Sequence, residues 1–285
     1  MSFIINQELC IQCGQCEPDC PALAISHEET TKKYEINQKR CIMCSHCACI
    51  CPMAAVEDGK EFFLDWKDPA CDPESLHIFL AGKRSVRQFH DREVPREILE
   101  KMLELGSYTG TASNAQDWHA TIVVSPEKKT ILRQGVQKMQ AQLCKAIKNK
   151  GIRILAKLIP AAKAYLDDPN IMDKLQALEE ELHSDHDRVF YQAPVVVILS
   201  TTKDSPFGAA NCILAGSAMM YVLQARGIGS CYIGFAEQML NRSKSICMQV
   251  GVPQGHKIHM VFALGYTKVK YQRLPHRKKM PVQFV

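Results

Sequence analysis

The sequence has no apolar run long enough to indicate a membrane span. A transmembrane helix needs roughly 20 consecutive apolar residues, whereas the most apolar stretch, Cys212 to Leu223, is shorter and contains Gly216 and Ser217. The N-terminus also lacks the basic start and the long apolar core of a secretory signal. We therefore expect a cytoplasmic chain with no membrane partner.

The signatures of several other protein classes are absent too. Lys and Arg number 35 against 30 Asp and Glu, for a formal charge of +5, and no basic run carries the interleaved aromatic residues that stack on bases. We expect no nucleic-acid partner, and an anionic cofactor or partner explains the small excess of charge equally well. No Ser-His-Asp arrangement or carboxylate pair stands out. Gly227 and Gly229 follow an expected helix and precede an expected strand, the reverse of the order in a dinucleotide fingerprint.

Cysteine is abundant and unevenly distributed. The 285-residue chain has 14 cysteines, and nine of them lie between positions 10 and 51. In a reducing compartment such a cluster indicates metal ligation before disulfide bonding. The length exceeds the needs of one ordinary domain, so we expect a large core with a small metal-binding module.

The cysteine-rich segment contains the same motif twice. Residues 10–21 and residues 41–52 both match C-x2-C-x2-C-x3-C-P. This spacing resembles the two-cluster bacterial ferredoxins, in which three cysteines of one loop and the fourth of the other hold each [4Fe-4S] cluster. By this rule one cluster is expected on Cys10, Cys13, Cys16 and Cys51, and the second on Cys20, Cys41, Cys44 and Cys47.

A pair of zinc knuckles or plain disulfides is the alternative for this segment. Zinc sites use two separated C-x2-C pairs. This spacing does not explain three evenly spaced cysteines followed by a Cys-Pro pair, a pattern that occurs here twice. Cys49 and His46 lie in the second loop, and we expect neither to be a ligand. Since so short a segment builds little apolar core, metal binding should supply much of its folding free energy.

The rest of the chain alternates helical and strand patterns. Residues 1–60 are expected to form the cluster-binding domain, 61–74 a polar, proline-broken linker, and 75–285 a second domain. Within it we expect helices at 73–83, 95–105 and 207–225, and strands at 119–124, 195–200, 229–233 and 258–264. Residues 127–190 form a helical stretch broken at Gly151, Pro160 and Pro169. The alternation predicts an α+β or α/β sandwich.

Three polar segments of this second domain are suited to binding an anionic cofactor. Residues 83–89 combine three cations with a serine hydroxyl directly after a helix, residues 111–119 supply hydroxyl and amide groups before a strand, and residues 274–281 form a second cationic cluster. Cations and hydroxyls of this kind hold phosphate. Taken alone, the first segment is equally well explained as a solvated basic loop.

Together these segments resemble the nitroreductase family. The family's R-R-S-x-R-x-F corresponds to residues 83–89, its P-S-x-x-N-x-Q-P-W to 110–118, and its G-x-G-S-x-x-x-G to 227–234. The basic tail and the apolar helix after Phe207 also correspond. The resemblance covers about residues 75–285 and is least specific between 127 and 190.

The resemblance implies an α/β sandwich with a mostly antiparallel central sheet, and a homodimer with FMN at the subunit interface. The residues that it places at the flavin are Lys83, Arg84, Ser85, Arg87, Thr111, Ser113, Asn114, Gln116, Ile233, Gly234, Arg277 and Lys279. The first four would contact the phosphate, the ribityl chain and the pyrimidine edge, and Asn114 would hydrogen-bond the ring system. No catalytic residue is assigned, because the flavin itself carries the chemistry.

The sequence departs from the family pattern at three positions. Lys83 stands where the family has arginine, which keeps the charge but loses bidentate recognition of phosphate. Gly110 and Asp117 stand where the family has proline, which loosens that loop. We expect FMN to bind despite these changes, with an altered substrate specificity.

We expect an oxidoreductase that passes electrons between the two clusters and FMN to reduce a small organic acceptor of the nitro, quinone or enone type. NAD(P)H or reduced ferredoxin would be the donor. A reductive dehalogenase or a flavin-modifying relative on the same fold is one alternative, and a non-catalytic electron carrier or redox-responsive binding protein is another. His183 and His186, three residues apart, could bind a metal, but a solvated helix end is the preferred interpretation.

Overall fold

The computed structural model describes residues 2–59, 71–159, 163, 166–182 and 187–285. The chain divides into two compact units. The first comprises Met1–Cys71 together with Gly110–Gln116, and the second comprises Asp72–Thr109 together with Asp117–Val285. Each unit is described by itself.

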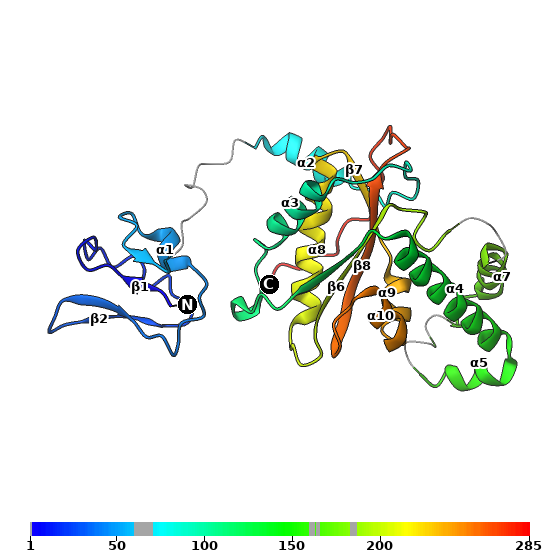
Figure 1. Cartoon of the computed structure of the whole chain (residues 1–285), viewed down its shortest axis with the longest axis horizontal. Helices are drawn as coiled ribbons and strands as arrows, with labels where there is room; N and C mark the ends of the chain where they lie inside the picture. Colours follow the sequence, from blue (N-terminus) through cyan, green and yellow to red (C-terminus); the bar gives the residue numbers. More distant parts are fainter. Residues whose placement is uncertain (1, 60–70, 160–162, 164–165, 183–186) are drawn as a thin grey trace. The chain divides into compact units, whose positions relative to one another are not determined.

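The first unit is built from two short antiparallel strand pairs (Figure 1). Strand β1 (Ile4–Ile5) pairs with β4 (Val56–Glu57), so the two ends of the cysteine-rich segment meet. Strand β2 (Ile25–Glu28) forms a hairpin with β3 (Lys33–Ile36) between the two cysteine loops. One short helix, α1 (His46–Ile50), follows in the second loop. The two cysteine loops are thus brought side by side by the pairing of their flanking strands.

The core of the first unit is very small. Its buried residues are Phe3, Ile25, Cys47, Ala48 and Val56, and several partly buried cysteines pack around them. So little apolar area cannot offset the conformational entropy lost when nearly sixty residues fold. The unit therefore needs a further source of folding free energy.

The second unit is organised around a four-stranded sheet in the order β5-β6-β8-β7. Its strands are β5 (His119–Val123), β6 (Val195–Thr202), β7 (Ile228–Tyr232) and β8 (His256–Tyr266). All three pairs are antiparallel. The two central strands, β6 and β8, are buried along almost their whole length, which explains why they are continuous apolar runs and do not alternate.

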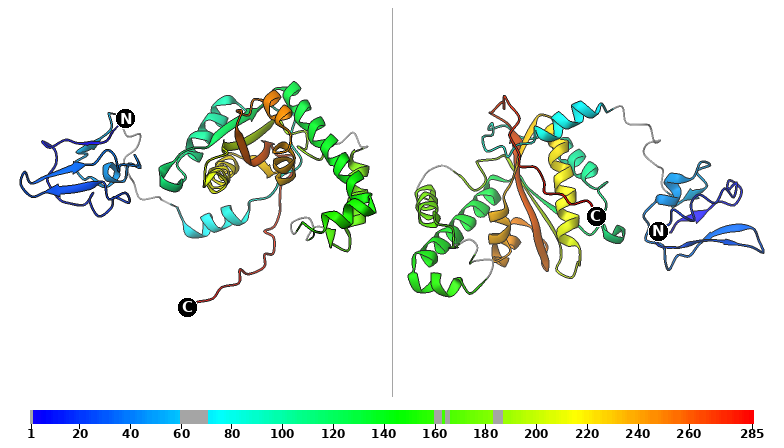
Figure 2. Two further views of the ribbon diagram at one scale, coloured as in Figure 1. Left: turned by 90° about the horizontal axis from the view of Figure 1, so that it is seen from below. Right: turned by 180° about the vertical axis from the view of Figure 1, so that it is seen from behind.

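Helices cover both faces of this sheet (Figures 1 and 2). One face packs against α3 (Arg96–Gly106) and α8 (Gly208–Ala225), with Met102, Cys212 and Leu223 in the buried cluster. The other face packs against α4 (Pro126–Lys148), α9 (Gly234–Leu240) and α10 (Lys244–Val250). Helix α2 (Pro73–Ala81) begins the unit, and α5 (Lys150–Ala156) and α7 (Ile171–Leu182) extend α4 beyond the sheet.

Side-chain caps set several of the helix starts. Asp72 accepts a hydrogen bond from the Ser75 amide at the start of α2, and Ser125 accepts one from the Lys128 amide at the start of α4. The expected break at Gly151 lies instead at Asn149, because the Asn149 side chain accepts from the Ile152 amide and begins α5 there. Gly151 is inside α5, so that position of the break was wrong by two residues.

Helix α8 corrects the expectation about membrane spans. It has 18 residues with a mean hydropathy of 1.2, so by length and composition it could cross a membrane. Its small residues instead serve close packing in the domain, since a Cβ on Gly216 would lie 2.2 Å from the Met260 sulfur of β8. A core helix of this kind passes the same hydropathy test.

Most of the expected elements are confirmed. The structure contains the helices predicted near 73–83, 95–105 and 207–225 and all four predicted strands, and the sheet is antiparallel with helices on both faces. Most of the expected linker, along with His183 and His186, lies outside the described residues.

Candidate functional site

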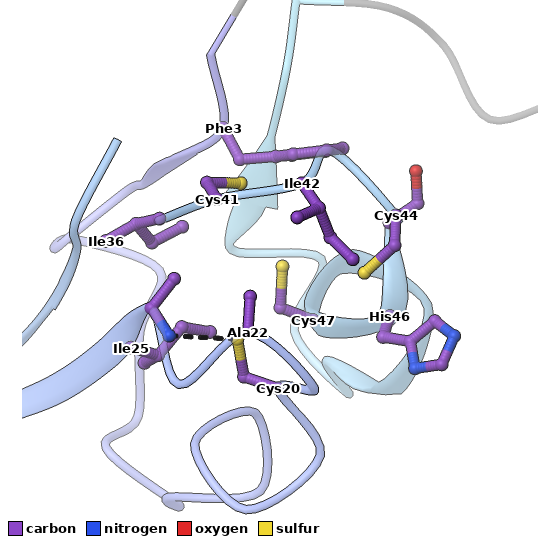
Figure 3. Close-up of a pocket in the computed structure, with 12 residues that line it drawn as sticks. Phe3, Cys20, Ala22, Ile25, Ile36, Cys41, Ile42, Cys44, His46 and Cys47 are labelled. Carbon is purple, nitrogen blue, oxygen red and sulfur yellow. Dashed lines mark hydrogen bonds between the residues drawn. The ribbon is translucent and has the colours of Figure 1, made fainter. Parts of the chain in front are cut away.

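Four cysteines of the first unit line one cavity. They are Cys20, Cys41, Cys44 and Cys47, the set that the ferredoxin pattern assigns to the second cluster. Figure 3 shows that Cys20 comes from the loop before β2, whereas Cys41 and Cys44 come from the loop that leads into α1 and Cys47 from α1 itself. Apolar side chains, among them Phe3 and Ile42, complete the wall. The structure thus brings one residue of the first motif to three residues of the second.

The other four cysteines line a second cavity. Cys10, Cys13, Cys16 and Cys51 surround it together with Tyr34 and residues near β4. Again the last cysteine of one motif joins three from the other. Both exchanged sets expected from the spacing are therefore placed around separate cavities.

The arrangement of the thiols bears on which metal group would fit. Zinc holds its thiolates at about 2.3 Å, so the four sulfurs of a zinc site must converge on one point. Among the residues that the structure describes, no group of three or more His, Cys, Asp or Glu side chains is placed to hold a single metal ion. Each cavity has four cysteines in its lining, which is the donor set of a [4Fe-4S] cluster, whose own atoms separate the ligands.

Backbone amides already point at three of the cysteine sulfurs. The Ala24 amide donates to Cys20 Sγ at 3.3 Å, the Met43 amide to Cys41 Sγ at 3.4 Å, and the Ala55 amide to Cys51 Sγ at 3.2 Å. Burial raises the pKa of the Cys47 thiol to about 11. A thiolate there needs compensating positive charge, which iron would supply, and the amide hydrogen bonds to sulfur tune a cluster's potential.

Cys49 lies outside both cavities, whereas His46 lines the cavity of the second cysteine set. Cys49 is exposed and lines neither cavity. The His46 ring is directed away from the four sulfurs of its cavity in Figure 3, and its Nδ1 lies 3.6 Å from the Asp19 carboxylate.

In the second unit, the expected flavin segment after α2 is held against strand β7. Ser85 and Ser230 form a parallel bridge, and the Val86 amide donates to the Ser230 carbonyl at 3.1 Å. The close approach of Val86 to β7 requires a glycine in that strand, because a Cβ on Gly229 would lie 2.7 Å from the Val86 side chain. The first and third family motifs are thereby brought together, and Ile233 and Gly234 follow directly at the end of β7.

Three cations of this segment have polar partners but no carboxylate. Lys83 Nζ donates to the carbonyls of Arg84 and Ser230 at 3.0 and 3.4 Å, Arg84 donates to the Ala81 carbonyl, and Arg87 Nε donates to the Tyr191 hydroxyl at 3.2 Å. Within the described part of the chain, none of the three forms an ion pair. Burial lowers the pKa of Lys83, and the neighbouring Arg84 lowers it further. Clustered cations without a counterion favour binding of an anion.

Three residues at this cationic segment were missed from the sequence. The Ser230 hydroxyl is buried without a hydrogen-bond partner among the described residues, so it is available to a bound group. Cys231 is almost fully buried beside Lys83 and Arg87. Burial raises the pKa of its thiol by more than these two cations lower it. The Arg87 guanidinium also lies 5.7 Å from the centre of the Tyr191 ring. Ser230 is inside the G-x-G-S motif, which could have identified it, whereas no local pattern marks Tyr191.

The segment with the second family motif has an unusual backbone. Ser113, Asn114 and Gln116 all have φ between 45° and 54°, a region that costs energy for residues other than glycine. Gln116 donates to Asn114 Oδ1 at 2.8 Å, and its amide donates to the Thr111 hydroxyl. Within the first unit, Asn114 Nδ2 donates to the carbonyls of Ile42 and Met43 at 3.0 and 2.8 Å. Its expected hydrogen bond to the flavin stays a prediction.

The basic tail stays a prediction as well. Arg277 and Lys279 are exposed in a C-terminal segment without regular secondary structure. Within the described part of the chain, neither forms an ion pair or a side-chain hydrogen bond with residues 83–87.

Asp117, where the family has proline, anchors a polar cluster in the second unit. Its carboxylate accepts from the Asn211 amide at 2.8 Å and from the Ser205 hydroxyl, which ties β5 to the start of α8. Burial opposes ionisation most strongly, but these hydrogen bonds together outweigh it, so the pKa of Asp117 lies below its ordinary value. Nearby, the Thr201 hydroxyl lies 2.9 Å from Nε2 of the buried His259. The aspartate therefore replaces the rigidity of proline with hydrogen bonds.

Comparison with known proteins agrees with both parts of the chain. Residues 9–55 match the 4Fe-4S dicluster domain, and residues 80–266 match the nitroreductase family. A 4-nitrobenzoate reductase of Nocardioides sp. is 33% identical over 58 residues, 20% of this chain and 24% of that protein. An iodotyrosine deiodinase of Haliscomenobacter hydrossis is 26% identical over 86 residues, 28% of this chain and 39% of that protein. The chain thus spans well under half the length of these relatives.

A nitroreductase of Bacteroides fragilis, solved with bound FMN, has the same fold as the second unit. It superposes with a TM-score of 0.53 at 22% identity, over 73% of this chain and 98% of that one. The expected fold class is confirmed, because the shared architecture is the α+β sandwich with an antiparallel sheet. The chain therefore belongs to the nitroreductase family, with a 4Fe-4S dicluster domain at residues 9–55.

Proposed function

We propose that the chain passes electrons between two [4Fe-4S] clusters and an FMN, which reduces a small organic acceptor of the nitro, quinone or enone type. The observation that carries this proposal is the placement of eight cysteines as two sets of four around two cavities, in one chain with a nitroreductase domain. Covalent linkage keeps the two kinds of redox centre at high effective concentration. FMN, when bound, converts single electrons from the clusters into the electron pairs that organic acceptors need.

The cationic segment would hold the phosphate and the polar edge of the flavin. We assign Lys83, Arg84 and Arg87 as charge partners, with the hydroxyls of Ser85 and Ser230 as hydrogen-bonding groups. The cations have no carboxylate partner among the described residues, and the Ser230 hydroxyl has no hydrogen-bond partner there. A cation beside the pyrimidine edge stabilises the anionic reduced flavin and raises its potential. The other flavin contacts proposed are Thr111, Ser113, Asn114, Gln116, Ile233, Gly234, Arg277 and Lys279.

Each cluster would take its ligands from both cysteine motifs. We assign Cys10, Cys13, Cys16 and Cys51 to one cluster and Cys20, Cys41, Cys44 and Cys47 to the other. Asn114, in the segment that resembles the family's flavin motif, donates to carbonyls lying between Cys41 and Cys44 in the sequence.

The reaction needs an external donor. Reduction of a nitro group to a nitroso group takes two electrons and two protons and releases water. The electrons would come from NAD(P)H or from reduced ferredoxin, and the protons from solvent. The cysteine-rich module needs a reducing environment, so we place the protein in the cytoplasm.

The test starts from the full-length chain purified without oxygen. We expect about eight iron atoms and one FMN for each chain. The protein is then mixed with NADH, NADPH and reduced ferredoxin in turn, and the flavin and cluster absorbances are followed before 4-nitrobenzoate or a quinone is added. Zinc without iron, or no flavin, would refute the proposal. Full cofactor loading without turnover of any acceptor would favour a non-catalytic electron carrier.

Reductive dehalogenation is a second candidate. It is favoured by the similarity of 86 residues to an iodotyrosine deiodinase. Release of iodide from iodotyrosine by the reduced protein, faster than its reduction of 4-nitrobenzoate, would support this candidate. Without iodide release the candidate is rejected.

A homodimer is expected to form through α8. The helix is apolar on all sides, and its residues Ile213 and Leu214 are 48% and 53% exposed although Cys212 and Ala215 are buried. The exposed side of α8 therefore offers an apolar surface to a second copy. Sedimentation of the wild type and of Leu214→Glu would test this assignment, since the charge should shift the chain to a monomer.

A further inference from the structure

Two residues shortly before β6 have a strained backbone. Tyr191 and Gln192 have φ values of 59° and 54°, in the left-handed region that residues other than glycine rarely adopt. Such strain persists only where the surrounding structure enforces it, and it is concentrated at active sites and ligand-binding clamps. We therefore ask what the Tyr191 side chain contacts in this conformation.

A buried aspartate holds the turn that contains Tyr191. The Asp187 carboxylate accepts three backbone hydrogen bonds, at 3.1, 2.9 and 3.1 Å, from the amides of Val189, Phe190 and Gln192. Val189 and Phe190 are also buried in the apolar cluster on the α4 side of the sheet. The turn is thus fixed on both sides of Tyr191, so the core and Asp187 together enforce its strained conformation.

In this conformation the Tyr191 phenol meets Arg87 of the flavin segment. Arg87 Nε donates to the Tyr191 hydroxyl at 3.2 Å, and the guanidinium carbon lies 5.7 Å from the centre of the ring. Arg87 Nη1 also donates to the Ser85 carbonyl at 3.3 Å. Arg87 is exposed, and an exposed arginine without such contacts samples many rotamers. The two hydrogen bonds and the ring contact therefore fix the orientation of its guanidinium.

A phenol orients Arg87 without cancelling its charge. A carboxylate partner would neutralise the guanidinium, whereas a phenol is uncharged at neutral pH. Within the part of the chain that the structure describes, Arg87 forms no ion pair and its Nη2 makes no hydrogen bond. The cation is thus oriented, keeps its full charge and retains N–H groups for a bound anion.

We propose that Tyr191 is a positioning residue that holds Arg87 as a preorganised cation for the reduced form of the flavin. This inference rests on the proposed function, in which Arg87 is a charge partner of FMN. Reduced FMN is anionic at its pyrimidine edge, so a cation that is already oriented stabilises the reduced form more than the oxidised form. Tyr191 therefore raises the affinity for reduced FMN above that for oxidised FMN, and with it the potential of the bound flavin.

The test compares the wild type with Tyr191→Phe, which removes only the hydroxyl. Dissociation constants of flavin-free, full-length protein for oxidised FMN and for dithionite-reduced FMN are measured without oxygen, from the free FMN that passes an ultrafiltration membrane. We expect the ratio of the reduced to the oxidised constant to rise about tenfold in the variant, equivalent to a drop of about 30 mV in the two-electron potential. A wild type that binds no FMN would refute the proposed function and this inference with it. FMN binding with an unchanged ratio in Tyr191→Phe would overturn this inference alone.

Two controls separate positioning from a purely structural role. Tyr266→Phe is the matched variant, because the Arg92 guanidinium lies 4.1 Å from the centre of the Tyr266 ring but outside the flavin segment. It should leave the ratio of the two constants unchanged. In an Arg87→Gln background, Tyr191→Phe should change this ratio less than about twofold, since the tyrosine acts through Arg87. A tenfold change that persists without Arg87, an equal change in Tyr266→Phe, or equal losses of affinity for both forms of FMN would overturn the proposal.

Discussion

The two units of this protein reach a folded state by different means. The first buries only Phe3, Ile25, Cys47, Ala48 and Val56 and gathers eight cysteines around two cavities. The second has a sheet that is buried on both faces between two extensive apolar clusters. Hydrophobic burial of roughly 25 cal/mol per Å² can stabilise the second unit but not the first. The comparison predicts that metal ligation stabilises one unit and packing stabilises the other.

Removal of iron should have the largest effect and should be confined to the first unit. Structural metal binding contributes about 10 kcal/mol or more to small metal-dependent domains. Anaerobic chelation should therefore unfold residues 2–59, as seen by rapid amide hydrogen exchange there, while exchange in β6 and β8 stays slow.

The cysteines offer a matched pair for the same measurement. Cys47→Ser should lose iron and raise exchange throughout the first unit, since Cys47 lines a cavity. Cys49→Ser should retain iron, because Cys49 is exposed and lines neither cavity. Protection of residues 2–59 that survives complete iron removal would contradict the comparison.

Truncating a buried side chain of the sheet should destabilise the second unit and leave the first unit unchanged. Phe262 of β8 is fully buried, and truncation of a buried phenylalanine costs about 3–5 kcal/mol. Phe262→Ala should lower the midpoint of urea unfolding of the second unit and leave the cluster absorbance of the folded protein unchanged. Phe207→Ala is the control, because Phe207 is 56% exposed and its removal should change the midpoint little.

Loss of a cation at the flavin segment should weaken FMN binding with little effect on either fold. A hydrogen bond to a charged group contributes about 1.5–3 kcal/mol, so Lys83→Ala should weaken FMN binding about tenfold or more. Fluorescence titration of flavin-free protein measures this. Arg96→Ala is the control, since Arg96 is a highly exposed cation paired with Glu100 on α3. An equal loss of FMN affinity in Lys83→Ala and Arg96→Ala would indicate an effect of net charge and contradict a direct contact of Lys83 with the flavin.

The smallest effect is expected at Asp117 and depends on pH. Its folded pKa is lowered, so its carboxylate stabilises the second unit above the ordinary aspartate pKa, and this contribution disappears as the pH falls through the folded pKa. Asp117→Asn should cost about 1 kcal/mol at neutral pH and nothing in acid. Urea unfolding of the wild type and of Asp117→Asn from neutral to acid pH tests the prediction. A difference in unfolding free energy between the two that grows toward low pH would contradict it.

The sequence predicted best where chemistry fixes the spacing. The repeated C-x2-C-x2-C-x3-C-P motif predicts both exchanged sets of cysteines, because short loops and the pairing of β1 with β4 leave few ways to arrange them. The four strands were predicted from apolar runs, since β6 and β8 are buried on both faces. The family motifs assigned residues of 83–87 and 233–234 to one flavin site, and the structure holds Ser85 and Val86 against β7.

Features that depend on tertiary contacts could not be predicted. Tyr191 contacts Arg87 from a part of the chain more than a hundred residues away, so no local pattern marks it. The same is true of the contacts of Asp117 with Ser205 and Asn211.

The central claim is that clusters and flavin form one electron-transfer system, and anaerobic stopped-flow absorbance tests it most directly. The protein is reduced with a limiting amount of donor, and the cluster and flavin signals are followed at separate wavelengths. The account predicts that electrons redistribute between the two kinds of centre faster than the enzyme turns over with its acceptor. Redistribution slower than turnover, with both centres fully loaded, would contradict it.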